Sequence, residues 1–241
     1  YREAAYWQSV KRQMEAGDYV LIQFAHNDEK TGGTDGDSLI AYYQYMGNDS
    51  AARAVDYRGT TPFDTYKQYL RRYVNETRQA GCPPVFVSPI CRMYFDAHDI
   101  RRNGRHDLGD KFNYIDSNGL KTAQKRPADD HTMDYVWQMK QVAEEMKVPF
   151  LDLTEATRHL FLSYGDTQCH TLLSDDNGST HLNATGATLI ARLAAQLMKD
   201  NGILASHVRL TKEPNVLSTM PISTHSTPSQ TPLLQPLTLP T

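Results

Sequence analysis

The chain has 241 residues, of which 39% are hydrophobic and 22% charged, so it is long enough for one ordinary domain with a buried core. Its formal net charge of −3, with the basic residues scattered, argues against nucleic acid as a partner. No run of about 18 apolar residues occurs, and we therefore expect no membrane span.

The first half of the chain predicts two helices, each followed by a strand. Residues 2–16 have the apolar spacing of an amphipathic helix, and the β-branched and aromatic run 19–24 is typical of a buried parallel strand. Pro62 is a favourable first residue for a helix that we expect to continue to about Ala80. The second strand is expected over residues 85–90.

The second half repeats this alternation. A helix over about residues 131–147 leads into a third strand at 149–153, and Thr154 is placed to cap the helix that follows and ends near Gly165. The last helix is expected over about residues 185–200. Because helix and strand alternate throughout, we predict an α/β fold with a parallel sheet covered by helices on both faces.

Three segments lack a helix or strand pattern. Residues 29–60 and 96–130 are long, polar and irregular, as loops that form lids or substrate-binding surfaces often are. Residues 211–241 are rich in Pro, Ser and Thr and have no charged side chain after Glu213, so they cannot bury enough apolar surface to offset their ordering entropy. We predict one domain over 1–210 and a disordered tail or linker over 211–241.

The cysteines do not indicate a metal site. Cys82, Cys91 and Cys169 lack the spacing of metal ligands, and no glycine-rich phosphate loop follows a strand, so we predict neither a metal nor a cofactor. Cys82 and Cys91 flank one predicted strand, which holds them too far apart for a disulfide. A disulfide between Cys91 and Cys169 is geometrically possible, and free buried thiols are the alternative.

Only three strands are predicted, which is few for a doubly wound sheet. A sheet of this size would leave a hydrophobic strand edge unpaired. We therefore expect an N-terminal segment ahead of Tyr1, or a second chain or domain, to complete the sheet.

Two polar segments carry candidate catalytic residues. Asn27 lies just past the first predicted strand, at the sheet edge where ligands bind in open α/β folds, and its side-chain amide is suited to stabilising an oxyanion. An ordinary Asn-Asp turn is the alternative. His181 lies in a loop before the last helix, with carboxylates shortly upstream, which suits a general base; an exposed surface histidine is the alternative.

Together these segments resemble a known family. Residues 17–28, Gly-Asp-Tyr-Val-Leu-Ile-Gln-Phe-Ala-His-Asn-Asp, resemble the asparagine block of the SGNH (GDSL-type) hydrolases, and most of all the rhamnogalacturonan acetylesterase branch, where a strand runs into Gly-His-Asn-Asp. Residues 180–187, Thr-His-Leu-Asn-Ala-Thr-Gly-Ala, are similar to that branch's histidine block. Segments 84–90 and 148–153 are similar to its later strands, and the resemblance covers about residues 5–205.

The resemblance implies a flavodoxin-like three-layer αβα sandwich with a parallel sheet, which is the SGNH hydrolase fold. It implies that Asn27 is an oxyanion donor and that His181 is the catalytic base of a serine esterase. The family's serine lies on elements before the asparagine block, which here would precede Tyr1. The resemblance also implies a secreted or periplasmic protein.

The sequence departs from the family pattern at two positions. Ala25 stands where the asparagine block has a glycine, and Gly178 stands where the family has the aspartate of its triad. Asp176 is our candidate to replace that carboxylate, with Asp175 as the alternative.

The family's serine motif does occur once in this chain, as residues 36–39, Gly-Asp-Ser-Leu. It follows the asparagine block instead of preceding it, and no apolar strand leads into it. A nucleophile needs a strand-to-helix turn that holds its hydroxyl beside the base, so we interpret Ser38 as a chance match.

The resemblance implies a carbohydrate esterase that removes acetyl groups from a plant polysaccharide such as pectin, with an acetylated oligo- or polysaccharide as its substrate. His26 and Arg92 are candidate substrate contacts, and a surface salt bridge is the alternative for Arg92. Loop tyrosines would supply stacking faces for sugar rings: Tyr42, Tyr43, Tyr45, Tyr94 and Tyr114. The competing hypothesis is a non-catalytic carbohydrate-binding or scaffold module, which Gly178 and the absent serine favour.

Overall fold

The computed structural model describes residues 4–210, so the predicted tail over 211–241 lies outside the described residues. Its centre is a parallel sheet with the strand order β1-β2-β5, made of β1 (Val20–Ile22), β2 (Pro84–Val87) and β5 (Phe150–Leu151). Val20 is aligned with Pro84, and Phe86 with Phe150. The predicted parallel α/β sheet is therefore confirmed, although each strand is shorter than the apolar run that predicted it.

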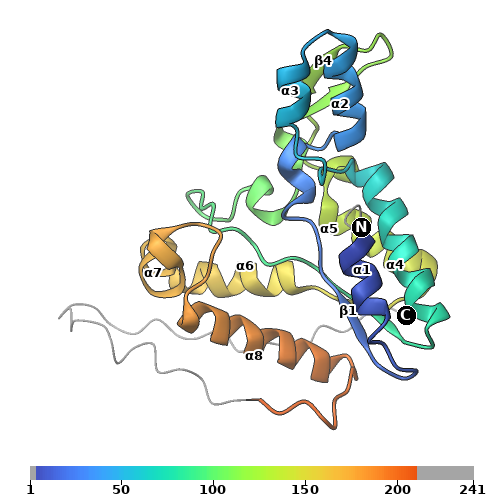
Figure 1. Cartoon of the computed structure of the whole chain (residues 1–241). Coiled ribbons are helices and arrows are strands. Elements are labelled where there is room, and N and C mark those ends of the chain that lie inside the picture. Colours follow the sequence, from blue (N-terminus) through green and yellow to red (C-terminus); the bar gives the residue numbers. More distant parts are fainter. Residues whose placement is uncertain (1–3, 211–241) are drawn as a thin grey trace.

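Helices cover both faces of this sheet (Figure 1). One face carries α1 (Ala4–Lys11), α4 (Lys67–Gln79) and α5 (Tyr135–Met146). The other carries α6 (Leu153–Tyr164) and α8 (Ala184–Asp200), and the short α7 (Asp166–Gln168) follows α6 at a distance from the strands (Figure 1). Residues 62–66 form a single π-helical turn that continues directly into α4, so the helix begins at Pro62 as predicted.

The central strand β2 explains why two hydrophobic cores form. All four of its residues are buried, and successive side chains of a strand point to opposite faces. Phe86 packs with Leu70, Val74 and Met139 on the face of α4 and α5. Val85 and Val87 belong to the second core, which contains side chains of α6 and α8. The sheet is thus the middle layer of three.

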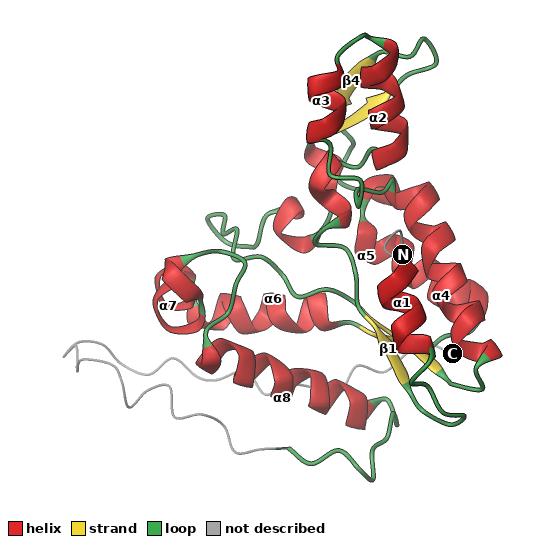
Figure 2. Cartoon of the chain, in the orientation of Figure 1, coloured by secondary structure: helices red, strands yellow, loops and turns green. Residues whose placement is uncertain are grey.

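The segments predicted to be irregular contain regular structure, which is a correction. Residues 29–60 include the helices α2 (Gly36–Tyr45) and α3 (Asp49–Ala54), and residues 96–130 include the antiparallel hairpin of β3 (Phe112–Ile115) and β4 (Lys121–Gln124). These elements form a lobe that projects from the sandwich, at the top of Figure 2. Two polar residues of the first segment are helix caps: Asp35 accepts a hydrogen bond from the Ser38 amide, and Asn48 from the Ala51 amide.

Two smaller expectations about helices are also wrong. The first helix ends at Lys11 and not near residue 16. The cap of α6 is Asp152, whose carboxylate accepts from the Glu155 amide at 2.9 Å, and not Thr154. The Thr154 hydroxyl instead donates to the Pro89 carbonyl at 2.5 Å, which fixes the start of α6 against the chain leaving β2.

The cysteines are free and buried. Cys91 and Cys169 are not joined, and their thiols lie 3.2 Å from the Thr154 carbonyl and 3.3 Å from the Phe161 carbonyl. Within residues 4–210, no helix is long and apolar enough to cross a membrane, and no His, Cys, Asp and Glu side chains are grouped as a metal site.

Truncating the central core residue Phe86 tests this architecture. Phe86→Ala is expected to lower the free energy of unfolding by about 3–5 kcal/mol, because it opens a cavity between β2 and two helices. The same substitution at the half-exposed Phe63 is the matched control and should cost about 1 kcal/mol or less. Urea unfolding measures both; similar losses would contradict the placement of Phe86.

Candidate active site

The asparagine block leaves the sheet at the carboxyl end of β1. Asn27 precedes a 3-10 turn over Asp28–Thr31, and its side chain is exposed. It lines a cavity of about 530 Å³ together with Gln23, Phe24 and Tyr66. Within the described part of the chain its side-chain amide has no hydrogen-bond partner, so both amide protons are available to a ligand.

Two buried tyrosines hold the backbone of this block. The Tyr66 hydroxyl donates to the Phe24 carbonyl at 3.1 Å, and the Tyr135 hydroxyl lies 2.9 Å from the Asp28 carbonyl oxygen. The Asp28 carboxylate accepts from the Thr60 hydroxyl at 2.9 Å. Burial raises the pKa of Asp28 to about 6, and the hydrogen bond from Thr60 acts in the opposite direction.

The histidine block is held by backbone bonds and by a helix cap. The Asp175 amide donates to the His181 carbonyl at 3.0 Å, and a β-bridge joins Ser174 to Leu182. Asn183 caps α8 through the Gly186 amide at 3.0 Å, and its own amide donates to the Leu172 carbonyl at 2.9 Å. The His181 ring itself is exposed.

Residues that follow β2 tie the two blocks together. The Arg92 guanidinium donates to the His26 carbonyl at 3.2 Å, and the amide of the next residue, Met93, donates to the Ser179 carbonyl at 2.7 Å. The candidate base and the candidate oxyanion donor therefore lie in segments about 150 residues apart, and both segments are hydrogen-bonded to the adjacent residues Arg92 and Met93.

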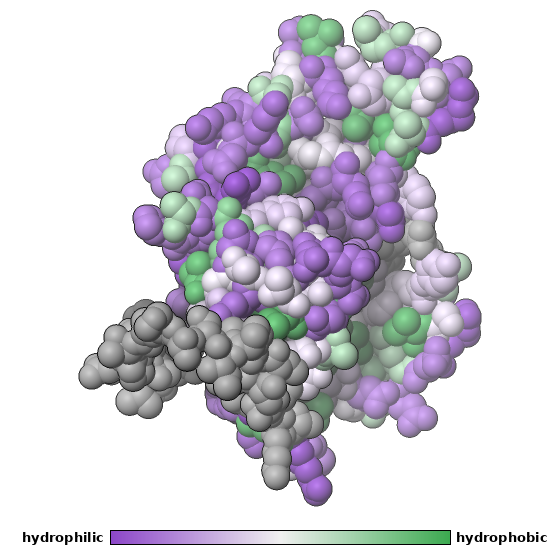
Figure 3. All heavy atoms as spheres, turned by 90° about the vertical axis from the view of Figure 1, so that its left-hand side faces the viewer, coloured by the Kyte–Doolittle hydropathy of each residue, from purple (hydrophilic) through white to green (hydrophobic). Residues whose placement is uncertain are grey.

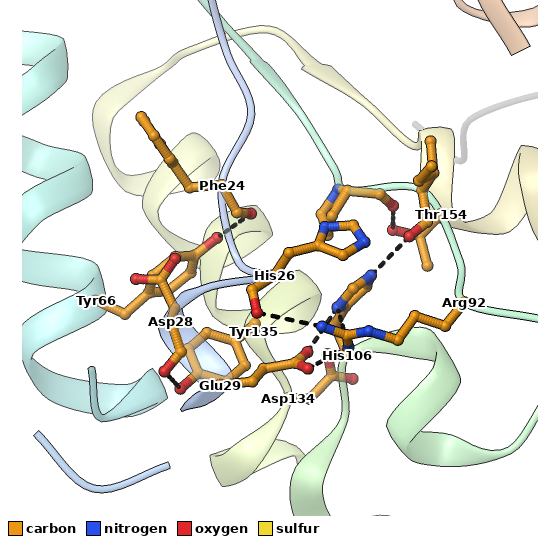
Figure 4. Close-up of polar contacts among 12 residues, drawn as sticks. Phe24, His26, Asp28, Glu29, Tyr66, Arg92, His106, Asp134, Tyr135 and Thr154 are labelled. Atoms are coloured by element: carbon orange, nitrogen blue, oxygen red, sulfur yellow. Dashed lines mark hydrogen bonds and ion pairs between the residues drawn. The ribbon is translucent and has the colours of Figure 1, made fainter. Parts of the chain in front are cut away.

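Beneath the asparagine block lies a buried cluster of charges (Figure 4). One Glu29 carboxylate oxygen is ion-paired with Arg92, and the other lies 2.6 Å from His106 Nδ1. The opposite ring nitrogen of His106 lies 2.7 Å from the Ile90 carbonyl oxygen. Both ring nitrogens thus face acceptors. The Glu29 carboxylate lies between the Arg92 guanidinium and the His106 imidazole.

His26 packs against this cluster. Its ring meets the His106 ring edge-on, with the centroids 4.5 Å apart, and its Nε2 is buried without a hydrogen-bond partner in the described residues. Burial, assisted by the electrostatic influence of the neighbouring His106 and Arg92, lowers the pKa of His26 to about 3.

The structure brings together some of the predicted site residues and leaves others apart. His181, His26 and Asn27 lie in one region. Arg92 lies in an ion pair with a side chain only 12% exposed, so the salt-bridge alternative is the observed one, buried and not on the surface. Its role as a substrate contact stays a prediction.

Among the described residues, no carboxylate is hydrogen-bonded or ion-paired with His181, the candidate base. Asp175 and Asp176 lie in an exposed turn, and neither makes a hydrogen bond or ion pair with His181 within the described residues. Asp176 has a left-handed backbone with φ of 50°, which belongs to this turn. The role of Asp176 as a triad carboxylate therefore has no contact to support it.

Ser38 is far from His181. It lies in the first turn of α2, where its hydroxyl is 3.2 Å from the capping Asp35 carboxylate. In Figure 1 this helix is in the projecting lobe at the top, whereas α7 and α8, between which His181 lies in the sequence, are at the lower left. The interpretation of the Gly-Asp-Ser-Leu match as accidental agrees with this placement.

The sequence alone did not identify Glu29 and His106. A histidine in a polar loop has no local pattern that reveals its partner, and the two residues are 77 positions apart. The usable signal was a glutamate two residues after Asn27, at a sheet edge where polar side chains converge.

Comparison with known proteins identifies relatives in Bacillus subtilis (strain 168). Rhamnogalacturonan acetylesterase RhgT is 28% identical over 212 residues, which cover 81% of this chain and 67% of RhgT. The probable rhamnogalacturonan acetylesterase YesY is 28% identical over 199 residues, which cover 81% of this chain and 69% of YesY. No family model matches the chain.

Among solved structures, the crystal structure of protein YXIM_BACsu from Bacillus subtilis is similar, with a TM-score of 0.50 and 18% sequence identity. The match covers 82% of this chain and 41% of that one, so this chain spans about two fifths of its length. At this identity the likeness concerns the fold alone.

The three-layer sandwich, with polar residues collected beyond the carboxyl ends of its strands, agrees with the SGNH hydrolase fold that the resemblance implied. The sequence similarity to the two rhamnogalacturonan acetylesterases supports an SGNH (GDSL-type) ester hydrolase that is rhamnogalacturonan acetylesterase-like. The resemblance predicted from the two blocks is thereby confirmed.

Removing the charge of Glu29 tests the buried cluster. Glu29→Gln leaves Arg92 and His106 without their shared anion and is expected to lower the free energy of unfolding by about 3–5 kcal/mol. Glu145→Gln is the matched control, since it breaks the exposed Arg71–Glu145 pair and should cost under about 1 kcal/mol. Equal effects in urea unfolding would show that the cluster does not hold the fold.

The two shifted groups at the site predict opposite pH effects. Because the pKa of His26 is lowered from 6.5 to about 3, the unfolded chain binds the proton more readily in this window, and stability falls as pH drops. Because the pKa of Asp28 is raised from 3.8 to about 6, the folded chain binds the proton more readily, and stability falls as pH rises through about 6.

Unfolding free energies at pH 7 and pH 5 measure these effects. His26→Gln should lose less stability than the parent on this acidification, and Asp28→Asn should lose more. The two variants act as controls for each other, and changes of the same sign in both would contradict the assignment.

Proposed function

We propose that this chain carries the asparagine and histidine of an esterase that removes acetyl groups from a pectin-type polysaccharide, of the rhamnogalacturonan kind. The names of both curated relatives support this substrate class. The observation that carries the proposal is the geometry: a free side-chain amide on Asn27 and an exposed imidazole on His181 are brought to one region by Arg92 and Met93.

In this proposal a serine hydroxyl attacks the acetyl carbonyl while His181 accepts the hydroxyl proton. The carbonyl oxygen becomes an oxyanion, to which the Asn27 amide donates. His181 returns the proton to the sugar oxygen as the bond between that oxygen and the acetyl carbon breaks, which leaves the acetyl group on the serine. Water then attacks the acetyl-serine while His181 accepts a proton from the water, and the proton passes to the serine oxygen as acetate leaves. Asp175 or Asp176 would orient the imidazole after a movement of their turn; otherwise a backbone carbonyl does so, less effectively.

The nucleophile is proposed to arrive on a strand that pairs with the outer edge of β1. That edge has no partner strand among the described residues, and the side chains beside it remain about half exposed: Tyr19, Leu21 and Phe24. An unpaired edge with apolar side chains is a strong site for strand addition. An N-terminal segment or a second domain is the proposed source.

The side of the molecule on which α7 lies is mostly hydrophilic where it is not drawn grey (Figure 3). Such a surface suits a highly hydroxylated polymer. Since polymeric pectin does not enter cells, we also propose that the protein is secreted or periplasmic and acts in pectin degradation.

The competing proposal is a non-catalytic carbohydrate-binding module. It is favoured by one observation: the His181 side chain makes no hydrogen bond or ion pair with a carboxylate or a serine hydroxyl among the described residues. In that case the region around Asn27 would bind sugar without hydrolysing it.

Hydrolysis of p-nitrophenyl acetate and of acetylated pectin oligosaccharide distinguishes the two proposals. In the active protein, His181→Ala should abolish hydrolysis, and Asn27→Ala should lower kcat about 10²- to 10³-fold. The exposed His159 on α6 supplies the matched control, because His159→Ala should leave the rate unchanged.

Ser38→Ala should also keep full activity. Loss of activity in this variant would contradict our interpretation of the Gly-Asp-Ser-Leu match. If folded protein is inactive both as this chain and as the full-length gene product, the binding module is the correct alternative.

A further inference from the structure

The projecting lobe contains a second cavity, of about 600 Å³. It is lined by three segments that are distant in sequence: residues 33–45 with α2, residues 61–65 before α4, and residues 112–126 with the β3–β4 hairpin. His181 and Asn27 are not among its lining residues.

Aromatic side chains are exposed around this cavity. Tyr45 is 84% exposed and Phe63 is 49% exposed, and the partly buried Tyr42 and Tyr114 line the same space. Large apolar side chains gathered at one place on a surface, unlike single exposed ones, mark a binding site. Rigid aromatic rings also give a large contact area at a small cost in side-chain entropy.

Hydrogen-bonding groups lie between these rings. Asp64 and Thr61 line the cavity from one side and Arg126 from another. The Arg126 guanidinium lies 5.1 Å from the centre of the Phe112 ring, and its Nε is buried without a hydrogen-bond partner among the described residues. A donor left in this state costs free energy that a bound acceptor can recover.

This combination selects among ligand classes. Asp64 accepts a hydrogen bond from Gln68 and Arg126 pairs with Asp130, but a purely apolar ligand would still desolvate these charged groups and leave the Arg126 Nε without an acceptor. A pyranose ring presents C–H faces, which stack on aromatic rings, and hydroxyl groups at its edge, which pair with carboxylates, hydroxyls and guanidinium groups. A sugar therefore matches both kinds of group at once.

The lobe cavity is a neighbour of the one that Asn27 lines. Thr60 lines the cavity of Asn27, and the next residue, Thr61, lines the lobe cavity. Gly33, at the start of the lobe, is only six residues beyond Asn27. A polymer of several sugar units can therefore contact both the lobe cavity and the region around Asn27.

We propose that the lobe cavity binds oligosaccharide as a second site, which holds the polymer away from the reacting acetyl group. This inference rests on the proposed carbohydrate substrate, but it concerns residues that take no part in the ester chemistry. The aromatic faces of Tyr45 and Phe63 form the stacking surface, and Arg126 supplies a hydrogen-bond donor.

Calorimetric titration of this chain with deacetylated rhamnogalacturonan oligosaccharide tests the proposal. Tyr45→Ala and Phe63→Ala should each weaken binding roughly three- to tenfold, the loss expected from one aromatic contact. Trp137→Ala is the matched control, since Trp137 is 41% exposed on α5 and lines neither of the two cavities, and it should bind as the parent does. His181→Ala should also keep binding.

Three outcomes would overturn the inference: no binding by the parent chain, equal binding by the lobe variants, or loss of binding only in His181→Ala. Sedimentation of the parent and Tyr45→Ala adds a fourth, because self-association that the substitution abolishes would make the lobe an interface between two copies.

Failure of this inference is distinguishable from failure of the proposed function. Hydrolysis of p-nitrophenyl acetate without oligosaccharide binding would reject the lobe site alone. Binding that depends on Tyr45 in a protein that hydrolyses no ester would reject the esterase and keep the lobe site.

Discussion

The arrangement of the site depends on one carboxylate. Glu29 pairs with Arg92 and His106, and through them joins the chain leaving β1 to the chain leaving β2. Glu29 is 9% exposed on its side chain and His106 is fully buried, so the pair is shielded from solvent. Because Met93 also holds the histidine block, the position of the candidate base relative to the candidate oxyanion donor follows from this cluster.

The parts of the fold that follow local patterns could be predicted from the sequence. The apolar runs before Asn27 and around Phe86 predicted buried parallel strands, because both faces of such strands are apolar. The helices of the lobe could not be predicted in this way, since Asp35 and Asn48 are equally typical of turns and of helix caps. Only the residues after them decide which role they take.

The residues of the candidate site show the same distinction between those that the sequence predicted and those that it did not. Asn27 and His181 were found because each lies in a short motif with a fixed place relative to a strand or helix. Glu29 and His106 were not, because their pairing is set by the packing of two loops and leaves no periodic pattern. The lobe adds a separate feature: its stacking faces come from α2 and the segment before α4, so binding of a polymer and cleavage of its ester are assigned to different parts of the chain.

Ala25 limits how this loop can vary among related proteins. Its φ of 154° lies in a region that glycine adopts freely and other residues rarely, and its side chain is only 2% exposed. The contacts of the surrounding loop hold the alanine in this conformation, and a branched or longer side chain would add steric strain where no space is left. Homologues that keep this loop shape should therefore carry only glycine or alanine here, which gives a simple criterion for separating them from proteins that share the strand pattern alone.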